Sequence, residues 1–225
     1  MKHNVKITKR EMKEDKFTTF ILLAKDYVTE RWQFVAGGVA AVVIIIGAII
    51  LMQSQQGKKD AAAMDIYNRA MGELRSGNSQ LAIVDFKSIV DDYGSTSHAK
   101  MAAFNLANAY FAARNYPEAK TAFENYLDKY SDSEYFMTSA MAGIADCLAG
   151  TEDFKAAADK YREIAEKYPD FKLTGEYYLK ALQNYIKANE MESAKVTLAK
   201  ITNDFKDTQY FMDGTRLAAE HGLRL

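Results

Sequence analysis

Hydrophobic and polar residues alternate in a helical rhythm along most of the chain, but one stretch near the N-terminus is apolar on every side. From Phe34 to Met52, nineteen residues carry no charge. At 1.5 Å per residue, a helix of that length covers roughly 28 Å, close to the ~30 Å hydrocarbon core of a bilayer. Further along, apolar residues recur at the spacing of amphipathic helices. The pattern predicts one membrane-spanning helix followed by a helical domain.

The apolar stretch has the composition of an uncleaved anchor. Its eleven Val, Ile, Leu and Phe residues contribute on the order of −3 to −7 kcal/mol to insertion. A cleaved signal peptide is disfavoured because "QSQQGKKD" follows in place of a small-residue cleavage site, and a buried core helix is disfavoured because no polar face is present. Trp32 lies where an interfacial aromatic anchor belongs. We therefore expect a span over 32–53.

Cations around the span predict its orientation. Lys13, Lys16, Lys25 and Arg31 precede it within twenty residues. The following side has three nearby cations, Lys58, Lys59 and Arg69. This excess predicts a cytoplasmic N-terminus and an extracytoplasmic C-terminal domain.

The segment before the span, 1–31, is basic and amphipathic. It carries eight Lys/Arg against five Asp/Glu, so its net charge is +3 and the remainder of the chain carries −4. A helix here would place Phe17, Phe20, Ile21, Ala24 and Val28 on one face. Such a helix can lie on an anionic leaflet or extend the anchor, and the sequence leaves both open. Small residues at 36, 37, 40 and 41 of the span leave a homodimer open too.

A repeat of 37 or 38 residues organises the rest of the chain. A column of alanines, a column of large residues four places later, and two further apolar columns all recur in step. The alanines are Ala82, Ala119, Ala157 and Ala194, and the large residues are Phe86, Phe123, Tyr161 and Leu198. Upstream, small or apolar residues recur at Ala70, Ala107, Ala145, Leu182 and Ala219. A small residue lets two antiparallel helices approach, and the large one fills the space toward the next pair.

Turn-forming segments such as "RNYPEA" and "SGNSQ" divide each unit into two helices. With Leu106, Ala107, Tyr110, Ala119, Phe123 and Tyr126, the chain resembles the tetratricopeptide repeat (TPR) family. Its departures are the longer interval, Arg69 where leucine is expected, and the absence of the repeat tryptophan. The resemblance implies an all-α protein: a short linker over 54–62, then a TPR-like α-solenoid over 63–225 with about four helix-turn-helix repeats and a C-terminal capping helix.

The resemblance also implies a concave groove, lined by the first helix of each pair, that holds peptides. The positions expected to face it are Tyr67, Met71, Met101, Phe104, Asn108, Phe111, Ala142, Asp146, Leu179, Gln183 and Ile186. Asn108 and Gln183 can hydrogen-bond a bound backbone, and Met and Phe offer adaptable apolar contact. The alternative, that Phe104 and Phe111 pack against the next repeat, stays open. The groove lacks a cluster of cations for a terminal carboxylate, so we expect an apolar or helical polypeptide ligand.

Catalytic chemistry is not expected. The three histidines are scattered, and the single cysteine, Cys147, lies inside a repeat helix without a paired histidine. Nucleotide, metalloprotease and hydrolase motifs are absent from the sequence. The near-neutral charge of −1 gives no reason to expect nucleic acid. We expect no enzyme, no cofactor, no metal, and no catalytic residue.

These features predict a single-pass anchored scaffold that binds polypeptide or envelope-protein partners and contacts the lipid bilayer through its anchor. The layout is similar to that of the family of ancillary subunits of the bacterial SecYEG translocon. This similarity implies a bacterial inner-membrane protein with its C-terminal domain in the periplasm, and a role in translocation or envelope assembly. The similarity is one of layout and transfers no residues. The alternative from another class is a structural homo-oligomer without a client.

Overall fold

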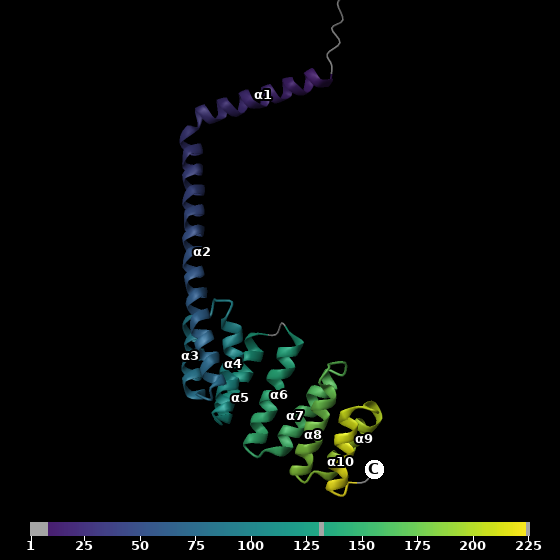
Figure 1. Ribbon diagram of the computed structural model, residues 1–225. Helices are drawn as coiled ribbons and strands as arrows, with labels where there is room; N and C mark the ends of the chain where they lie inside the picture. Colours follow the sequence, from purple (N-terminus) through teal and green to yellow (C-terminus); the bar gives the residue numbers. More distant parts are fainter. Residues whose placement is uncertain (1–8, 131–132, 224–225) are drawn as a thin grey trace, which may run out of the picture. The chain divides into compact units, whose positions relative to one another are not determined.

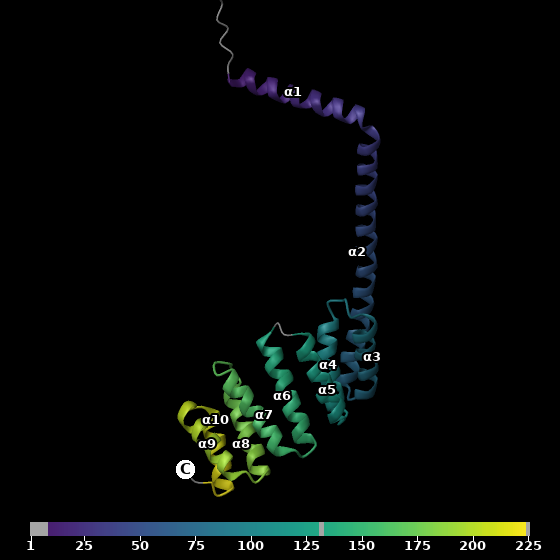
Figure 2. The same ribbon diagram turned by 180° about the vertical axis from the view of Figure 1, so that it is seen from behind.

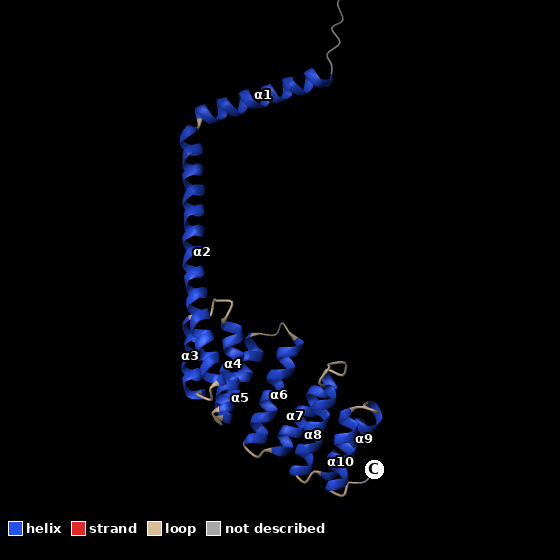
Figure 3. Cartoon of the chain, viewed as in Figure 1, coloured by secondary structure: helices blue, strands red, loops and turns tan. Residues whose placement is uncertain are grey.

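The computed structural model describes residues 9–130 and 133–223, and in this part of the chain every regular element is an α-helix (Figure 3). This confirms the predicted all-α class. The first eight residues of the basic segment, the side chains of residues 9–16 (with Lys13 and Lys16) and of Asp26, residues 131–132 and residues 224–225 lie outside the described part. The helices are α1 (Lys9–Glu30), α2 (Trp32–Arg75), α3 (Ser79–Asp92), α4 (Ala99–Ala112), α5 (Tyr116–Lys129), α6 (Glu134–Gly150), α7 (Phe154–Lys167), α8 (Thr174–Lys187), α9 (Met191–Asp204) and α10 (Gln209–Glu220).

The chain divides into two compact units, Met1–Gly57 and Lys58–Leu225. Helix α2 runs through the boundary without a break, so the residues expected as a linker, 54–62, are helical. The reason is local, because this stretch is rich in Gln, Lys and Ala, contains no proline, and has only Gly57 as a weak helix former.

The first unit presents its apolar side chains to the outside. Helix α2 is long and apolar enough to cross a bilayer, and none of its most apolar 18-residue window is buried by protein. All the large apolar side chains from Phe17 to Val28 on α1 are exposed as well. Protein packing therefore covers neither stretch within the described chain.

The second unit is a row of antiparallel helix pairs that follow one another in chain order (Figures 1 and 2). The pairs are formed by the end of α2 with α3, α4 with α5, α6 with α7, and α8 with α9. Neighbouring pairs share a core: for example, Ala107 of α4, Phe123 of α5 and Ile144 of α6 belong to one buried cluster. Helix α10 packs against α8 and α9 and ends the row. The predicted solenoid and its capping helix are confirmed.

The repeat columns correspond to the buried positions. The four alanines from Ala82 to Ala194 are fully buried, and the large residues four places later are at most 3% exposed. The prediction fails at the last unit, where Ala219 is exposed and its neighbour Ala218 is buried instead. In α8, Leu182 belongs to a cluster that includes Ala194 and Leu198 of α9. No helix follows α10 in the described residues, so Ala219 has no comparable partner.

Arg69 departs from the repeat because it closes the N-terminal end of the row. The matching residue of the second pair, Leu106, lines a cleft with Val90 of the preceding α3. No helix pair precedes α2 in the described part of the chain, so Arg69 meets no such neighbour. It donates instead from Nε and Nη2 to the two carboxylate oxygens of Asp85, each at 2.7 Å. This bidentate pair forms a polar end to the solenoid.

The turns inside the four pairs share one backbone geometry. Gly77, Arg114, Glu152 and Asn189 have φ of 82°, 60°, 65° and 59°. In each turn the next residue donates its backbone N–H to the carbonyl five residues earlier, at 2.9 Å. This is the left-handed helix ending in which glycine is the favoured residue. Among the four turns only the first has glycine at this position. Arg114 and Glu152 therefore have a strained backbone conformation.

Candidate functional site

The predicted groove residues all lie on the first helices of the pairs: the end of α2, α4, α6 and α8. We call the side of these helices that carries them the first-helix surface. They fall into rows that step from pair to pair at the repeat interval. The packed row is Tyr67, Phe104, Ala142 and Leu179, and the central row is Met71, Asn108, Asp146 and Gln183.

Contacts within the protein occupy most of the packed row. The ring of Tyr67 meets Phe86 edge-on at 5.7 Å between centroids, and its hydroxyl accepts a hydrogen bond from Asn105 at 2.9 Å. The Phe104 ring lies 5.3 Å from both Tyr126 and Phe136. Ala142 is buried and Leu179 half-buried. Tyr67 and Phe104 thus make contacts both within their own pair and to the next one, and packing against the next repeat is the role that sequence reasoning had left open for Phe104.

The central row is more accessible. Met71, Asn108 and Asp146 are half-buried and Gln183 is exposed. Beside this row, Met101 is half-buried, and Phe111 at the end of α4 is 36% exposed, with its ring 5.5 Å from that of Tyr116. Met71 also packs against the buried cluster of α2, α3 and α4. The structure therefore leaves two thioethers, two amides, a carboxylate and an aromatic ring at least partly accessible to a ligand. Ile186 of α8 is buried.

Asp146 is fixed by groups from two further helices. The Tyr161 hydroxyl of α7 donates a short hydrogen bond to its carboxylate, and Lys180 of α8 lies 3.5 Å away. Lys180 Nζ also sits 5.2 Å from the centre of the Tyr161 ring. Burial, together with the charge of Asp146, raises the pKa of Tyr161 far above its ordinary value, so this hydroxyl stays a donor. Asp146 thus enters the surface as a rigid, paired carboxylate.

Sequence reasoning missed Tyr161 and Lys180 as partners of Asp146. Tyr161 had been recognised only as a core residue of the large-residue column, and its hydroxyl gives no signal of its own in a periodicity. Lys180 stands 34 residues from Asp146, on the next first helix. Only the stacking of the pairs brings these three side chains together.

Nucleophilic and metal chemistry find little support in the described residues. Cys147 is 1% exposed. Burial and the nearby Asp146 raise the pKa of its thiol to about 12, which keeps the reactive thiolate scarce at neutral pH. No group of three or more His, Cys, Asp or Glu side chains that could hold a metal ion occurs in the described part of the chain.

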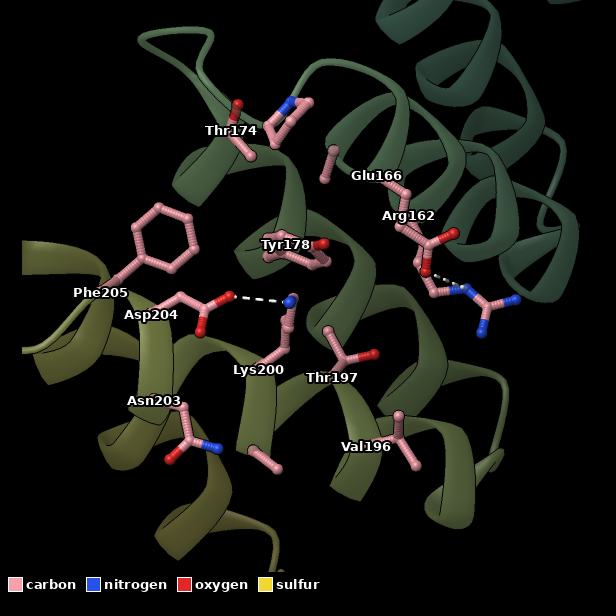
Figure 4. A pocket seen from close by; sticks show the side chains of 13 residues that line it. Arg162, Glu166, Thr174, Tyr178, Val196, Thr197, Lys200, Asn203, Asp204 and Phe205 are labelled. Atoms are coloured by element: carbon pink, nitrogen blue, oxygen red, sulfur yellow. Dashed lines mark ion pairs between the residues drawn. The ribbon is translucent and has the colours of Figure 1, made fainter.

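Clefts also open between the second helices of the pairs. The larger one, about 600 Å³, lies between α7 and α9 over Tyr178 of α8 (Figure 4). A smaller one, about 450 Å³, lies between α3 and α5 over Leu106 and Tyr110 of α4. In the larger cleft the charged groups pair within their own helices, Lys200 with Asp204 at 2.8 Å and Arg162 with Glu166 at 3.9 Å. Both clefts form where second helices of successive pairs stack side by side. Neither is lined by a predicted groove residue.

A row of helix pairs with a shared core and a residue row that repeats along one surface defines an α-solenoid scaffold. The sequence profile of the family described as "tetratricopeptide repeat-like domain" matches residues 25–167, from the end of α1 to the end of α7. The match covers more than half of the chain, and the protein belongs to this family.

Among 21 matching chains of solved structures, one is residues 41 to the end of MamA from Desulfovibrio magneticus RS-1. It aligns with a TM-score of 0.52 and 17% identity, over 71% of this chain and 90% of that one. At this identity the similarity concerns the fold. The comparison with curated proteins gave no match. Family and fold together establish a TPR-like scaffold, an architecture whose extended surfaces bind polypeptides in general.

Proposed function

We propose that this protein is a single-pass membrane-anchored scaffold that binds polypeptide partners on its first-helix surface, on the extracytoplasmic side of a bacterial inner membrane. The observation that carries the proposal is the central row, whose side chains are exposed or partly exposed on four consecutive helix pairs, while most of the packed row makes contacts within the protein. A continuous row of this kind suits an extended or helical segment better than a small molecule.

The anchor part of the proposal is supported by α2. Its apolar stretch is unburied by protein and long enough to span the hydrocarbon core. The excess of Lys and Arg before the span supports a cytoplasmic N-terminus and a periplasmic repeat domain. In that position the scaffold would meet newly translocated or envelope polypeptides, which favours a role in protein translocation or envelope assembly.

The chemistry of the surface describes the ligand. Met71, Met101 and Phe111 lie toward the N-terminal end of the row and offer adaptable apolar contact. Asn108 and Gln183 can donate to and accept from a peptide backbone. Asp146 already has a cationic partner in Lys180 at 3.5 Å, so the row has no strong demand for a charged ligand. The preferred partner is a predominantly apolar or helical segment.

The first test places a photo-crosslinking amino acid at Asn108 or Phe111 of the full chain in native membranes. We expect a ladder of adducts with other polypeptides. The matched control is the same amino acid at Val84, which is 65% exposed on the second helix α3, and it should give few adducts. Adducts with a second copy alone would replace the client-binding proposal by the structural homo-oligomer.

A paired substitution tests the surface itself. Asn108→Ala with Phe111→Ala should weaken capture of these partners with little loss of helicity, because both side chains are accessible. Phe104→Ala is unsuitable, since it removes a ring that contacts three others and should destabilise the fold. Full retention of the partners by the double variant would exclude this surface as the binding site.

A further inference from the structure

Helix α1 carries an apolar face that no described part of the protein covers. Phe17, Phe20, Ile21, Ala24 and Val28 follow the spacing of one helix face, and Tyr27 lies beside them. Phe17 and Phe20 are 66% and 69% exposed, and all the large members are exposed. We call these six residues the α1 apolar face.

The other side of α1 is mostly polar over the same turns. Thr18, Thr19, Lys25 and Thr29 lie there, and the Thr29 hydroxyl donates to the carbonyl of Lys25 at 3.0 Å. Two exposed leucines depart from this pattern: Leu22 lies among the polar residues, and Leu23 lies at the boundary between the two sides. A helix with one apolar and one polar side suits an interface, whereas a helix that crosses a bilayer is apolar all round, as the stretch from Phe34 to Met52 of α2 is.

Helix α1 is also separate from the span. It ends at Glu30, Arg31 forms a turn, and α2 begins at Trp32. The Arg31 guanidinium lies 5.6 Å from the centre of the Tyr27 ring, which places a cation at the edge of the apolar face. Val28 is four residues from Trp32, so at 1.5 Å per helical residue it stands within roughly 6 Å of the start of the span. Chain connectivity alone holds the face at the membrane boundary.

We propose that α1 lies along the surface of the leaflet at which α2 enters, with its apolar face in the boundary between headgroups and acyl chains. This rests on the proposed anchoring by α2. The occupant of the face is lipid, because a single residue, Arg31, connects α1 to α2 and because residues 1–31 carry a net charge of +3, which favours the anionic surface of a membrane. The protein then has two lipid contacts of different kinds, one across the bilayer and one along it.

The test uses the full chain in vesicles of phosphatidylethanolamine and phosphatidylglycerol. Cys147→Ala removes the native thiol, and an environment-sensitive fluorophore is attached at Phe20→Cys, on the apolar face, or at the matched control Thr19→Cys, on the polar side. Lipids with a spin label near the headgroup serve as quenchers. We expect quenching at position 20 several-fold stronger than at position 19.

Trp32, the one tryptophan of the chain, reports independently on the span in the unlabelled protein. If Trp32 is quenched but positions 19 and 20 are quenched equally, α1 is surrounded by lipid or by water on all sides and the inference is overturned. If Trp32 is quenched and neither label is, α1 is off the membrane or covered by a second copy, which also overturns it. An unquenched Trp32 would instead remove the anchor, and with it the membrane part of the proposed function.

Discussion

Isoleucine has opposite surroundings in the two units of the molecule. Ile44, in the apolar stretch of α2, is 70% exposed, while Ile89, Ile164 and Ile201, on three second helices of the repeat domain, are fully buried. The same side chain is covered by neighbouring helices in one unit and by no described part of the protein in the other. An apolar side chain alone therefore does not indicate whether protein buries it. The spacing of the apolar residues around it, periodic or continuous, does.

The physical difference is how each helix becomes stable. The second helices α3, α5, α7 and α9 have 14 residues each, a length at which isolated helices are marginal in water. They depend on one apolar stripe that fits the next pair. In the proposed anchoring, helix α2 satisfies its backbone hydrogen bonds internally and is stabilised in lipid by its length and its continuous apolar surface. The periodic stripe and the continuous run are thus two solutions to the burial of apolar side chains.

The largest effect should come from charge in the span. Ile45→Arg together with Ile49→Arg should cost about 5 to 7 kcal/mol of insertion free energy, because each arginine at the centre of a spanning helix costs roughly 2.5 to 3.5 kcal/mol. This offsets the estimated gain from the apolar residues. The measurement is resistance of the protein to extraction from membranes at alkaline pH.

The matched control places the same change in the repeat domain. Val84→Arg with Val196→Arg alters side chains that are 65% and 64% exposed, somewhat more than Ile45 and Ile49 at 58% and 48%, and extraction should stay as in the parent protein. If the Ile45/Ile49 variant also stayed in the membrane, α2 would not be the anchor, and the contrast between the two units would need another explanation.

A smaller effect is expected from overpacking the repeat. Ala119→Leu should lower the free energy of unfolding by about 1 to 3 kcal/mol, because the added carbons have no space between α4 and α5. Thermal unfolding followed by circular dichroism measures it. Ala219→Leu, at an exposed alanine of α10, should leave the melting temperature nearly unchanged, and an unchanged melting temperature for Ala119→Leu would show that this site is not tightly packed.

The sequence was sufficient for the helix pairs because their signal is periodic. The alanine and large-residue columns return at each unit, and each column faces the same neighbour every time, so position in the repeat predicts burial. Position in the repeat no longer predicts burial at the ends of the row, where a helix has a neighbouring pair on one side only. Arg69 and Ala219 stand at the two ends of the row, and there the missing neighbour, more than the local residues, decides exposure.

The candidate surface was only partly predictable. Which helices carry it followed from the repeat, but the division into a packed and a central row did not. Phe104 and Tyr67 are drawn into internal contacts by Phe136 and Asn105, residues of the following first helices. The sequence also did not predict how closely the pairs approach one another. Gly143 has no room for a side chain, because a Cβ there would come within 2.4 Å of the Phe123 ring. Contacts of this kind depend on the stacking geometry, which periodicity does not encode.

Alkaline pH should destabilise the repeat domain through its buried tyrosines. Burial raises the pKa of Tyr161 and Tyr185 in the folded repeat domain, and Asp146 and Asp159 add to it, whereas in the unfolded chain these hydroxyls ionise near 10.0. The unfolded state therefore loses protons first, so the stabilisation is complete below pH 10 and is lost as the pH rises above it. The expected loss is about 1.4 kcal/mol per pH unit for each tyrosine.

Urea unfolding of the repeat domain within the full chain at pH 9 and pH 11 measures this loss. Tyr161→Phe should show a smaller drop between the two pH values than the parent protein, because one ionising group is gone. Ala119→Leu keeps every tyrosine and is the matched destabilised control, which should show the full drop. Equal drops for all three proteins would mean that Tyr161 ionises as readily in the fold as in water.

The smallest expected effect is a gain in the stability of the repeat domain, with no change in membrane attachment. Glu152 has a left-handed backbone with φ of 65°, at the position that glycine occupies in the first pair as Gly77. Glu152→Gly should raise the free energy of unfolding by about 0.5 to 1 kcal/mol, because relief of 1 to 2 kcal/mol of strain exceeds the added entropy of the unfolded chain. Urea unfolding should show the gain while membrane extraction stays unchanged. The matched change Asn189→Gly should raise the free energy of unfolding by less, since asparagine tolerates this conformation. A loss of stability in Glu152→Gly would mean that the Glu152 side chain stabilises the fold by more than its strained backbone destabilises it.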